Sequence, residues 1–236
     1  MAALCQAILY ILGHHPLSED HVEKLEHCRR LIVVISHTSY WDFFLLALYR
    51  QTDSRIKENL YLAVNPKPFE RWGWLLEPMG CIPTTRAEDS GQGFVDSMVK
   101  RFRHQPCRFI VSPEGQLKPV PWRSGYYYLC QGLEADMVVA GVDYERKELH
   151  VGPLHRWKEL KNQSREEVEK QLQQEMGEIV PLNLDGSYTP VTRDYDPDEV
   201  GAFSLSRVLV FVLIWIILSL VAVWLIWELF YPSKKK

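Results

Sequence analysis

Short apolar runs alternate along this chain with segments of helical pattern, and this alternation constrains the fold more than any other feature. The runs cover Leu31–Ile35, Leu60–Val64, Cys107–Val111 and Met137–Val142. Apolar, often β-branched stretches of this length between turn residues are typical of buried strands. Strands that alternate with helices form layered domains with a parallel sheet. We therefore expect an α/β fold with a mainly parallel central sheet flanked by helices.

The segments between these runs predict the helices of the flanking layers. Phe94, Met98 and Phe102 recur every four residues, which indicates an amphipathic helix over 93–103. Glu148–Val151 is expected to pair with the strand before it across a polar bend. Further helices are expected over 41–50, 69–76 and 123–133, and extended chain over 79–83.

The length of 236 residues suits one domain with an appendage, or two small domains. Ser164 and Glu167 form a capping box that predicts a helix to about Ile179, and the prolines that follow indicate a linker. The expected parts are an N-terminal helical segment 1–30, a main domain 31–180, a linker 181–203, a membrane anchor 204–231 and a basic tail 232–236.

The segment Val208 to Trp227 contains no charged residue. As a helix of about 20 residues it would be about 30 Å long, the thickness of the hydrocarbon core of a bilayer. It is apolar on all faces, which argues against a buried core helix. We expect a single C-terminal transmembrane helix with the main domain facing the cytosol, at the endoplasmic reticulum if the source is eukaryotic.

The first residues, MAALCQAILYIL, are apolar but too short to span a membrane. Two interpretations stay open for them: they lie in the membrane interface, or they cap the core. The net charge of the whole chain is −3, and residues 204–236 carry +3, so the preceding part carries −6. This balance argues against nucleic acid as a partner. The five cysteines show no Cys-x-x-Cys spacing and are expected to be free thiols.

Three turns that follow expected strands carry side chains able to do acid–base or binding chemistry. Loops at the carboxyl ends of parallel strands meet at one edge of the sheet, so we expect these turns to form one site. They offer a base, a carboxylate, a cation and a glycine for a tight turn. The residues are His37 and Asp42 in the first turn, Thr84, Thr85 and Arg86 in the second, and Glu114 and Gly115 in the third.

Four stretches, in this order, resemble the motifs of the glycerolipid acyltransferase family, which includes the 1-acylglycerol-3-phosphate acyltransferases. HTSYWD resembles its His-x-x-x-x-Asp signature, and GCIPTTR resembles its second block, a glycine followed at fixed distance by an arginine. VSPEGQ resembles its Pro-Glu-Gly block and MVVAGVDY its fourth, apolar block. The similarity spans Leu31 to Gly152, within the expected acyltransferase domain 31–180.

The resemblance implies that His37 is the general base and Asp42 its partner. Histidine has an unperturbed pKa near ~6.5, which suits proton transfer at cytosolic pH. Asp42 would hold the histidine tautomer and stabilise the imidazolium, as in a serine hydrolase triad. The resemblance also implies acyl-CoA as co-substrate, a lysolipid acceptor, and no metal or other cofactor. The acceptor-binding residues that it implies are Thr85, Arg86, Glu114 and Gly115.

The chain departs from the family pattern after Pro-Glu-Gly, where the usual Thr and Arg are replaced by Gln116 and Leu117. Lys118 or Arg123 could supply the missing cation. Two alternatives therefore stay open: a transacylase or monoacylglycerol-type enzyme with a non-phosphorylated acceptor, and a catalytically decayed, tail-anchored lipid-binding or scaffold protein. Ser39 lacks the Gly-x-Ser-x-Gly setting of a nucleophile. The oligomeric state is not indicated.

Overall fold

The computed structural model describes residues 2–36, 39–84, 93–115 and 120–179. All of them belong to the first of the two units into which the chain divides, Met1–Tyr195 and Asp196–Lys236. The predicted linker, transmembrane anchor and basic tail lie outside the described residues. Within the described ranges no helix combines the length and the apolar character needed to cross a membrane.

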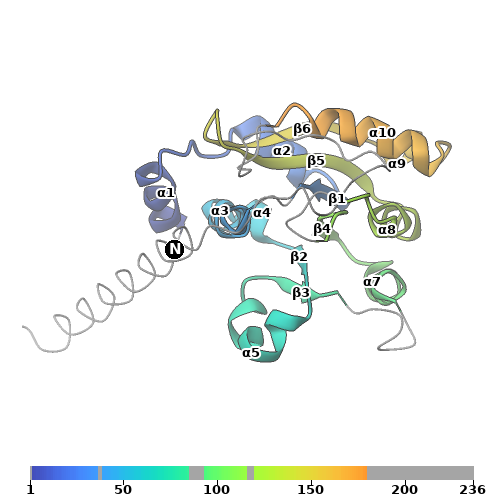
Figure 1. The fold of residues 1–236 in the computed structure, drawn as a ribbon, viewed down its shortest axis with the longest axis horizontal. Helices are drawn as coiled ribbons and strands as arrows, with labels where there is room; N and C mark the ends of the chain where they lie inside the picture. The colour runs from blue at the N-terminus through green and yellow to red at the C-terminus, as the bar shows by residue number, and fades with distance from the viewer. Residues whose placement is uncertain (1, 37–38, 85–92, 116–119, 180–236) are drawn as a thin grey trace, which may run out of the picture. The chain divides into compact units, whose positions relative to one another are not determined.

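The described strands form one sheet in the order β3-β2-β4-β1-β5-β6 (Figure 1). Every neighbouring pair is parallel except β5 and β6, which are antiparallel. The predicted α/β fold with a mainly parallel central sheet is therefore confirmed. The strands are β1 (Arg30–Ile35), β2 (Leu60–Val64), β3 (Cys81–Pro83), β4 (Cys107–Val111), β5 (Asp136–Asp143) and β6 (Glu148–His155).

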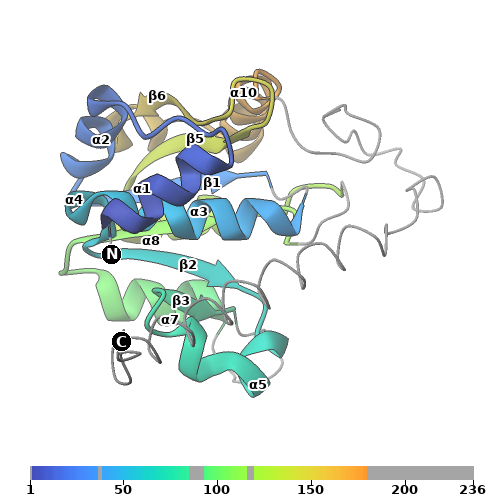
Figure 2. The same cartoon turned by 90° about the vertical axis from the view of Figure 1, so that its left-hand side faces the viewer.

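The helices pack on both faces of this sheet, as Figures 1 and 2 show. Helices α1 to α5 contribute side chains to one core cluster, and helices α7 to α10 contribute side chains to the other. They are α1 (Ala2–Ile11), α2 (Glu19–Glu26), α3 (Tyr40–Thr52), α4 (Ser54–Lys57), α5 (Lys67–Leu76), α7 (Phe94–Phe102), α8 (Gly125–Leu133), α9 (Trp157–Leu160) and α10 (Arg165–Met176).

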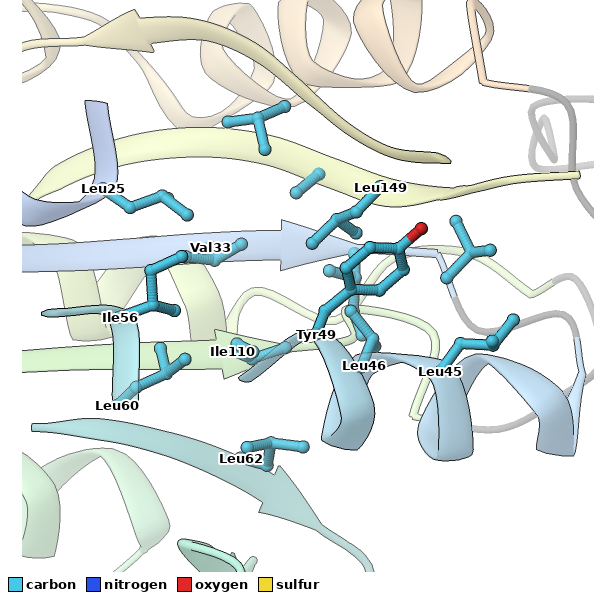
Figure 3. Packing of buried hydrophobic residues seen from close by; sticks show 14 of the residues in the cluster. Leu25, Val33, Leu45, Leu46, Tyr49, Ile56, Leu60, Leu62, Ile110 and Leu149 are labelled. Atoms are coloured by element: carbon cyan, nitrogen blue, oxygen red, sulfur yellow. The ribbon is translucent and has the colours of Figure 1, made fainter. Parts of the chain in front are cut away.

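The period-two geometry of the strands separates the two core clusters. On β1, Leu31, Val33 and Ile35 pack into the cluster beneath α1–α4, because alternate side chains of a strand point to opposite faces. The intervening residues, Ile32 and Val34, pack into the cluster beneath α7, α8 and α10. Figure 3 shows the first cluster, in which Tyr49 and its neighbours on α3 share one core with side chains of β1, β4 and β6. Both faces of the sheet are thus covered, which explains why the central strands β1 and β5 have apolar side chains on both faces.

Most sequence predictions agree with the structure to within a few residues. The predicted strands β2 and β4 have the observed bounds, and β1 and β5 are extended by one or two residues. Strand β6 extends four residues beyond the predicted end at Val151. The Ser164–Glu167 capping box is present, but its helix ends at Met176 rather than near Ile179. The chain continues in tighter turns, in which the Glu178 N–H donates to Glu175 O and the Ile179 N–H donates to Met176 O. The short helices α4 and α9 were not predicted from the sequence.

The N-terminal helix α1 packs one side onto α3. Cys5 and Leu9 are buried in the core cluster, so this side caps the core, as one of the two interpretations predicted. The other side exposes Leu4, Tyr10 and Ile11 to solvent. A location in the membrane interface stays a prediction.

Candidate active site

The carboxyl ends of five parallel strands lie along one edge of the sheet, and the predicted motif residues follow these ends. Strand β1 lies between β4 and β5, with Val34 aligned to Val111 on one side and Val139 on the other. Because the three strands are parallel and in register, the segments after them start at the same edge. These segments contain Asp42, Glu114 and Tyr144.

Asp42 lies in the first turn of α3, where a serine–aspartate capping box holds its side chain. The Ser39 backbone N–H donates to Asp42 Oδ2 at 2.8 Å, and the Ser39 hydroxyl accepts from the Trp41 N–H at 3.1 Å. Such a box satisfies backbone donors that a helix start leaves unpaired. Asp42 is 4% exposed. The sequence therefore places a buried, oriented carboxylate at the carboxyl edge of the sheet. A catalytic role for Asp42 stays a prediction.

Tyr144, at the turn after β5, makes a second bond to the same carboxylate. Its hydroxyl donates to Asp42 Oδ1 at 2.6 Å, a short distance typical of a donor on an ionised acceptor. Burial, together with the neighbouring charge of Asp42, raises the pKa of the Tyr144 phenol far above its ordinary value. Tyr144 therefore stays protonated and acts as a donor. Sequence reasoning did not single out this residue, although it ends the quoted MVVAGVDY stretch.

The Pro-Glu-Gly turn after β4 carries a buried glutamate and places its glycine beside a cation. Glu114 is buried, whereas Gly115 is exposed and has a φ of +65°. The turn is closed by the Gly115 N–H, which donates to Ser112 O at 3.2 Å, and by the Arg123 N–H, which donates to Pro113 O at 2.9 Å. A Cβ built on Gly115 would lie 3.6 Å from Nη1 of Arg123. The exposed Arg123 guanidinium thus lies directly beside Gly115.

The second motif is described only in part. Thr84 follows β3 and is fixed to the end of β2, because its N–H and hydroxyl both donate to Val64 O, at 2.8 and 3.1 Å. The rest of this motif, Thr85 and Arg86, lies outside the described residues. The same is true of His37 in the first motif and of Gln116, Leu117 and Lys118 after the Pro-Glu-Gly turn.

The described residues contain no group of three or more His, Cys, Asp or Glu side chains that could hold a metal ion. All five cysteines are buried free thiols. Burial raises the pKa of Cys28, Cys81 and Cys107 to about 11 and that of Cys130 to about 12, so these thiols are poor nucleophiles at neutral pH.

The comparison with known families agrees with this geometry. A model of the family described as "Acyltransferase" matches residues 19–138, which is more than half of the chain. The chain belongs to the acyltransferase family. The resemblance predicted from the four motifs is confirmed, and the protein is an acyltransferase.

The acyltransferase fold is also found in a solved structure. The chain is similar to the 1-acyl-sn-glycerophosphate (LPA) acyltransferase PlsC from Thermotoga maritima, with a TM-score of 0.51 and 12% identity, over 75% of this chain and 77% of that chain. At this identity the similarity shows that the fold is shared. A search of curated proteins found no match.

Proposed function

We propose that this acyltransferase is a membrane-anchored O-acyltransferase that moves a fatty acyl group from acyl-CoA to a glycerolipid acceptor such as lysophosphatidic acid, a step of phospholipid biosynthesis. The observation that carries the proposal is the position of the Asp42 carboxylate. It is buried at the N-terminus of α3, which follows β1. The neighbouring strand β4 brings the Glu114–Gly115 turn to the same edge of the sheet. A carboxylate held in this way suits a partner for a histidine base.

In the proposed reaction, His37 takes the proton from the acceptor hydroxyl as its oxygen attacks the thioester carbon. Asp42 orients the imidazole and balances the positive charge that forms on it. The new C–O bond forms, the C–S bond breaks, and the imidazolium gives its proton to the leaving thiolate. The products are the acylated lipid and free CoA, without a covalent acyl-enzyme. Such proton transfer contributes about 10²–10⁴-fold to rate.

The position of Arg123 favours a phosphorylated acceptor over monoacylglycerol. Its guanidinium lies beside the Gly115 turn, is exposed, and forms no ion pair with a carboxylate of the described residues. A guanidinium offers a planar set of donors that suits a phosphate group. Arg123 would therefore replace the cation that Leu117 does not supply. We propose that Thr85, Arg86, Glu114 and Gly115 complete the acceptor site.

The predicted span from Val208 to Trp227 would hold the enzyme at the bilayer that contains the lysolipid and the product. Confinement to one surface raises the effective concentration of such substrates. We propose that the catalytic domain faces the cytosol, where acyl-CoA is available.

The test uses the purified full-length chain in phosphatidylcholine vesicles. Labelled acyl-CoA is offered with lysophosphatidic acid, lysophosphatidylcholine or monoacylglycerol in separate reactions. We expect transfer to lysophosphatidic acid, a loss of at least about 100-fold in His37→Ala, and a rise in KM for this acceptor in Arg123→Gln. If acyl transfer survives in His37→Ala, His37 is not the general base. If monoacylglycerol is acylated and Arg123→Gln does not change that rate, the acceptor is the non-phosphorylated alternative. No transfer with any acceptor would support the scaffold alternative.

A further inference from the structure

Both oxygens of the Asp42 carboxylate accept hydrogen bonds, and only one of these bonds is local. Oδ2 accepts from the Ser39 N–H three residues away, whereas Oδ1 accepts from the Tyr144 hydroxyl, 102 residues along the chain. The local bond is a consequence of the helix cap. The distant bond, at 2.6 Å, fixes the rotation of the carboxylate plane, because two donors on different oxygens leave it a single orientation.

The backbone of the β5–β6 turn holds Tyr144 rigidly. The preceding residue, Asp143, has no exposed surface, and its Oδ1 accepts from the N–H groups of Glu145 and Arg146 at 3.0 and 2.7 Å. Its Oδ2 pairs with the Arg146 guanidinium at 2.9 Å. An aspartate that closes a turn in this way leaves little freedom to the residue beside it.

The segment after α1 supports the same tyrosine from the side. The ring of His14 packs edge-on against both Tyr49 and Tyr144, with 6.2 Å between ring centroids in each case. The Tyr49 hydroxyl lies 3.2 Å from His14 Nδ1 and donates to His15 O at 3.0 Å. Since that hydroxyl has one proton, it accepts from His14 Nδ1–H. The His15 N–H donates to Lys147 O at 2.7 Å, so this segment also binds the turn that carries Tyr144.

We propose that Tyr144 is a positioning residue of the acyl-transfer reaction: its hydroxyl sets the orientation and the charge of the Asp42 carboxylate. The inference rests on the proposed function, in which Asp42 orients the histidine base. Tyr144 touches no reacting atom and acts through Asp42 alone.

This role makes a prediction that differs from that of a stabilising core tyrosine. A hydroxyl that donates to Asp42 withdraws negative charge from it, and the imidazolium beside a more negative carboxylate is more stable. Removal of the hydroxyl should therefore raise the pKa of the general base as well as loosen the carboxylate. A tyrosine that served only packing would change stability and leave that pKa in place.

The experiment compares Tyr144→Phe with Tyr49→Phe in the full-length enzyme in vesicles. Both remove one hydroxyl from a tyrosine packed against His14, but only Tyr144 bonds Asp42. We expect Tyr144→Phe to lower kcat about tenfold, which corresponds to the loss of about one hydrogen bond to a charged group. The KM values should stay the same, and the acid limb of kcat/KM should move to higher pH. Tyr49→Phe, which weakens only the packing beside Tyr144, should leave the limb in place and lower kcat less than Tyr144→Phe does. The proposal is overturned if Tyr144→Phe has the kcat of the wild type, or if the acid limb of its kcat/KM profile lies at the wild-type pH.

Two further variants keep the proposal testable if Tyr144→Phe is unstable. A 3-fluorotyrosine at position 144 keeps the shape and is a stronger donor, so the acid limb should move to lower pH; an unmoved limb counts against the proposal. In an Asp42→Asn background, Tyr144→Phe should lower kcat no further, whereas an additive loss shows an effect independent of Asp42. Failure of the proposed function is recognised separately, because wild type would then transfer no acyl group, or His37→Ala would stay active.

Discussion

The Arg50 guanidinium fills the space beside Gly80 that a side chain at this position would need. A Cβ on Gly80 would lie 2.6 Å from Nη2 of Arg50 and 2.9 Å from Leu60 O, and the φ of Gly80 is +80°. Arg50 is buried, and its Nε and Nη2 donate to Leu60 O and Lys57 O, each at 3.3 Å. The glycine of the GCIPTTR motif is thus required by backbone conformation and by the packing of a buried cation.

Replacement of Gly80 by alanine should destabilise the domain strongly. We expect Gly80→Ala to lower the free energy of unfolding by about 3 kcal/mol, since a left-handed non-glycine residue costs about 1 and overpacking about 2. Gly115→Ala is the control, because its φ is also positive but its Cβ would be in ordinary contact with Arg123. It should cost about 1 kcal/mol. Urea denaturation measures both, and equal losses would contradict the role of Arg50.

Ser39 and Ser164 cap α3 and α10 with the same type of box, but only Ser39 holds Asp42. Substitution of either serine by alanine should cost about 1 kcal/mol of stability. Only Ser39→Ala should also lower kcat, by several-fold, because the turn that carries Asp42 loosens. Urea denaturation and steady-state kinetics on both variants check this. Complete loss of activity in Ser39→Ala would instead reopen a nucleophilic role for this serine.

His14 should make stability sensitive to mild acid. Burial lowers its pKa below the ordinary 6.5, and the nearby Lys147 and His15 lower it further. The unfolded chain therefore binds a proton more readily than the folded one, so stability falls as the pH drops below about 6.5 and levels off below the folded pKa. Burial also lowers the pKa of His21, so this histidine adds to the loss of stability in mild acid. The urea midpoint at pH 7.5 and 5.5 should differ less in His14→Leu than in wild type; an equal difference would contradict the assignment.

The cysteines should resist thiol reagents until the protein unfolds. All five are buried, and burial raises their pKa. A thiol whose pKa is near 11 carries very little thiolate at pH 8. We expect a disulfide-exchange reagent to react slowly with native protein and to titrate five thiols in urea. Rapid reaction of one thiol in the native protein would show that this cysteine is accessible, and would contradict its burial in the fold.

Local pattern predicted most of the secondary structure. The strands β1, β2, β4 and β5 were found because each is a short apolar run between turn residues, and such runs depend on neighbours in the chain. The Ser164 cap was predicted because it depends on side-chain chemistry within three residues. The Ser39–Asp42 cap has the same local cause but was not predicted. The helices α4 and α9 were missed because each has only four residues, too few to show a period.

The sequence alone determined the alternation of strands and helices, the caps, and the order of the motifs that identifies an acyltransferase. Only the tertiary structure decided that Tyr144 bonds Asp42, that Arg123 lies beside Gly115, and that Arg50 packs against Gly80. The Tyr144–Asp42 pair depends on strand order, because β1 and β5 are neighbours in the sheet although a long segment of chain separates them. A hydrogen bond requires atoms to meet within about 3 Å. Such a meeting is set by the packing of the whole sheet and leaves no period in the local sequence.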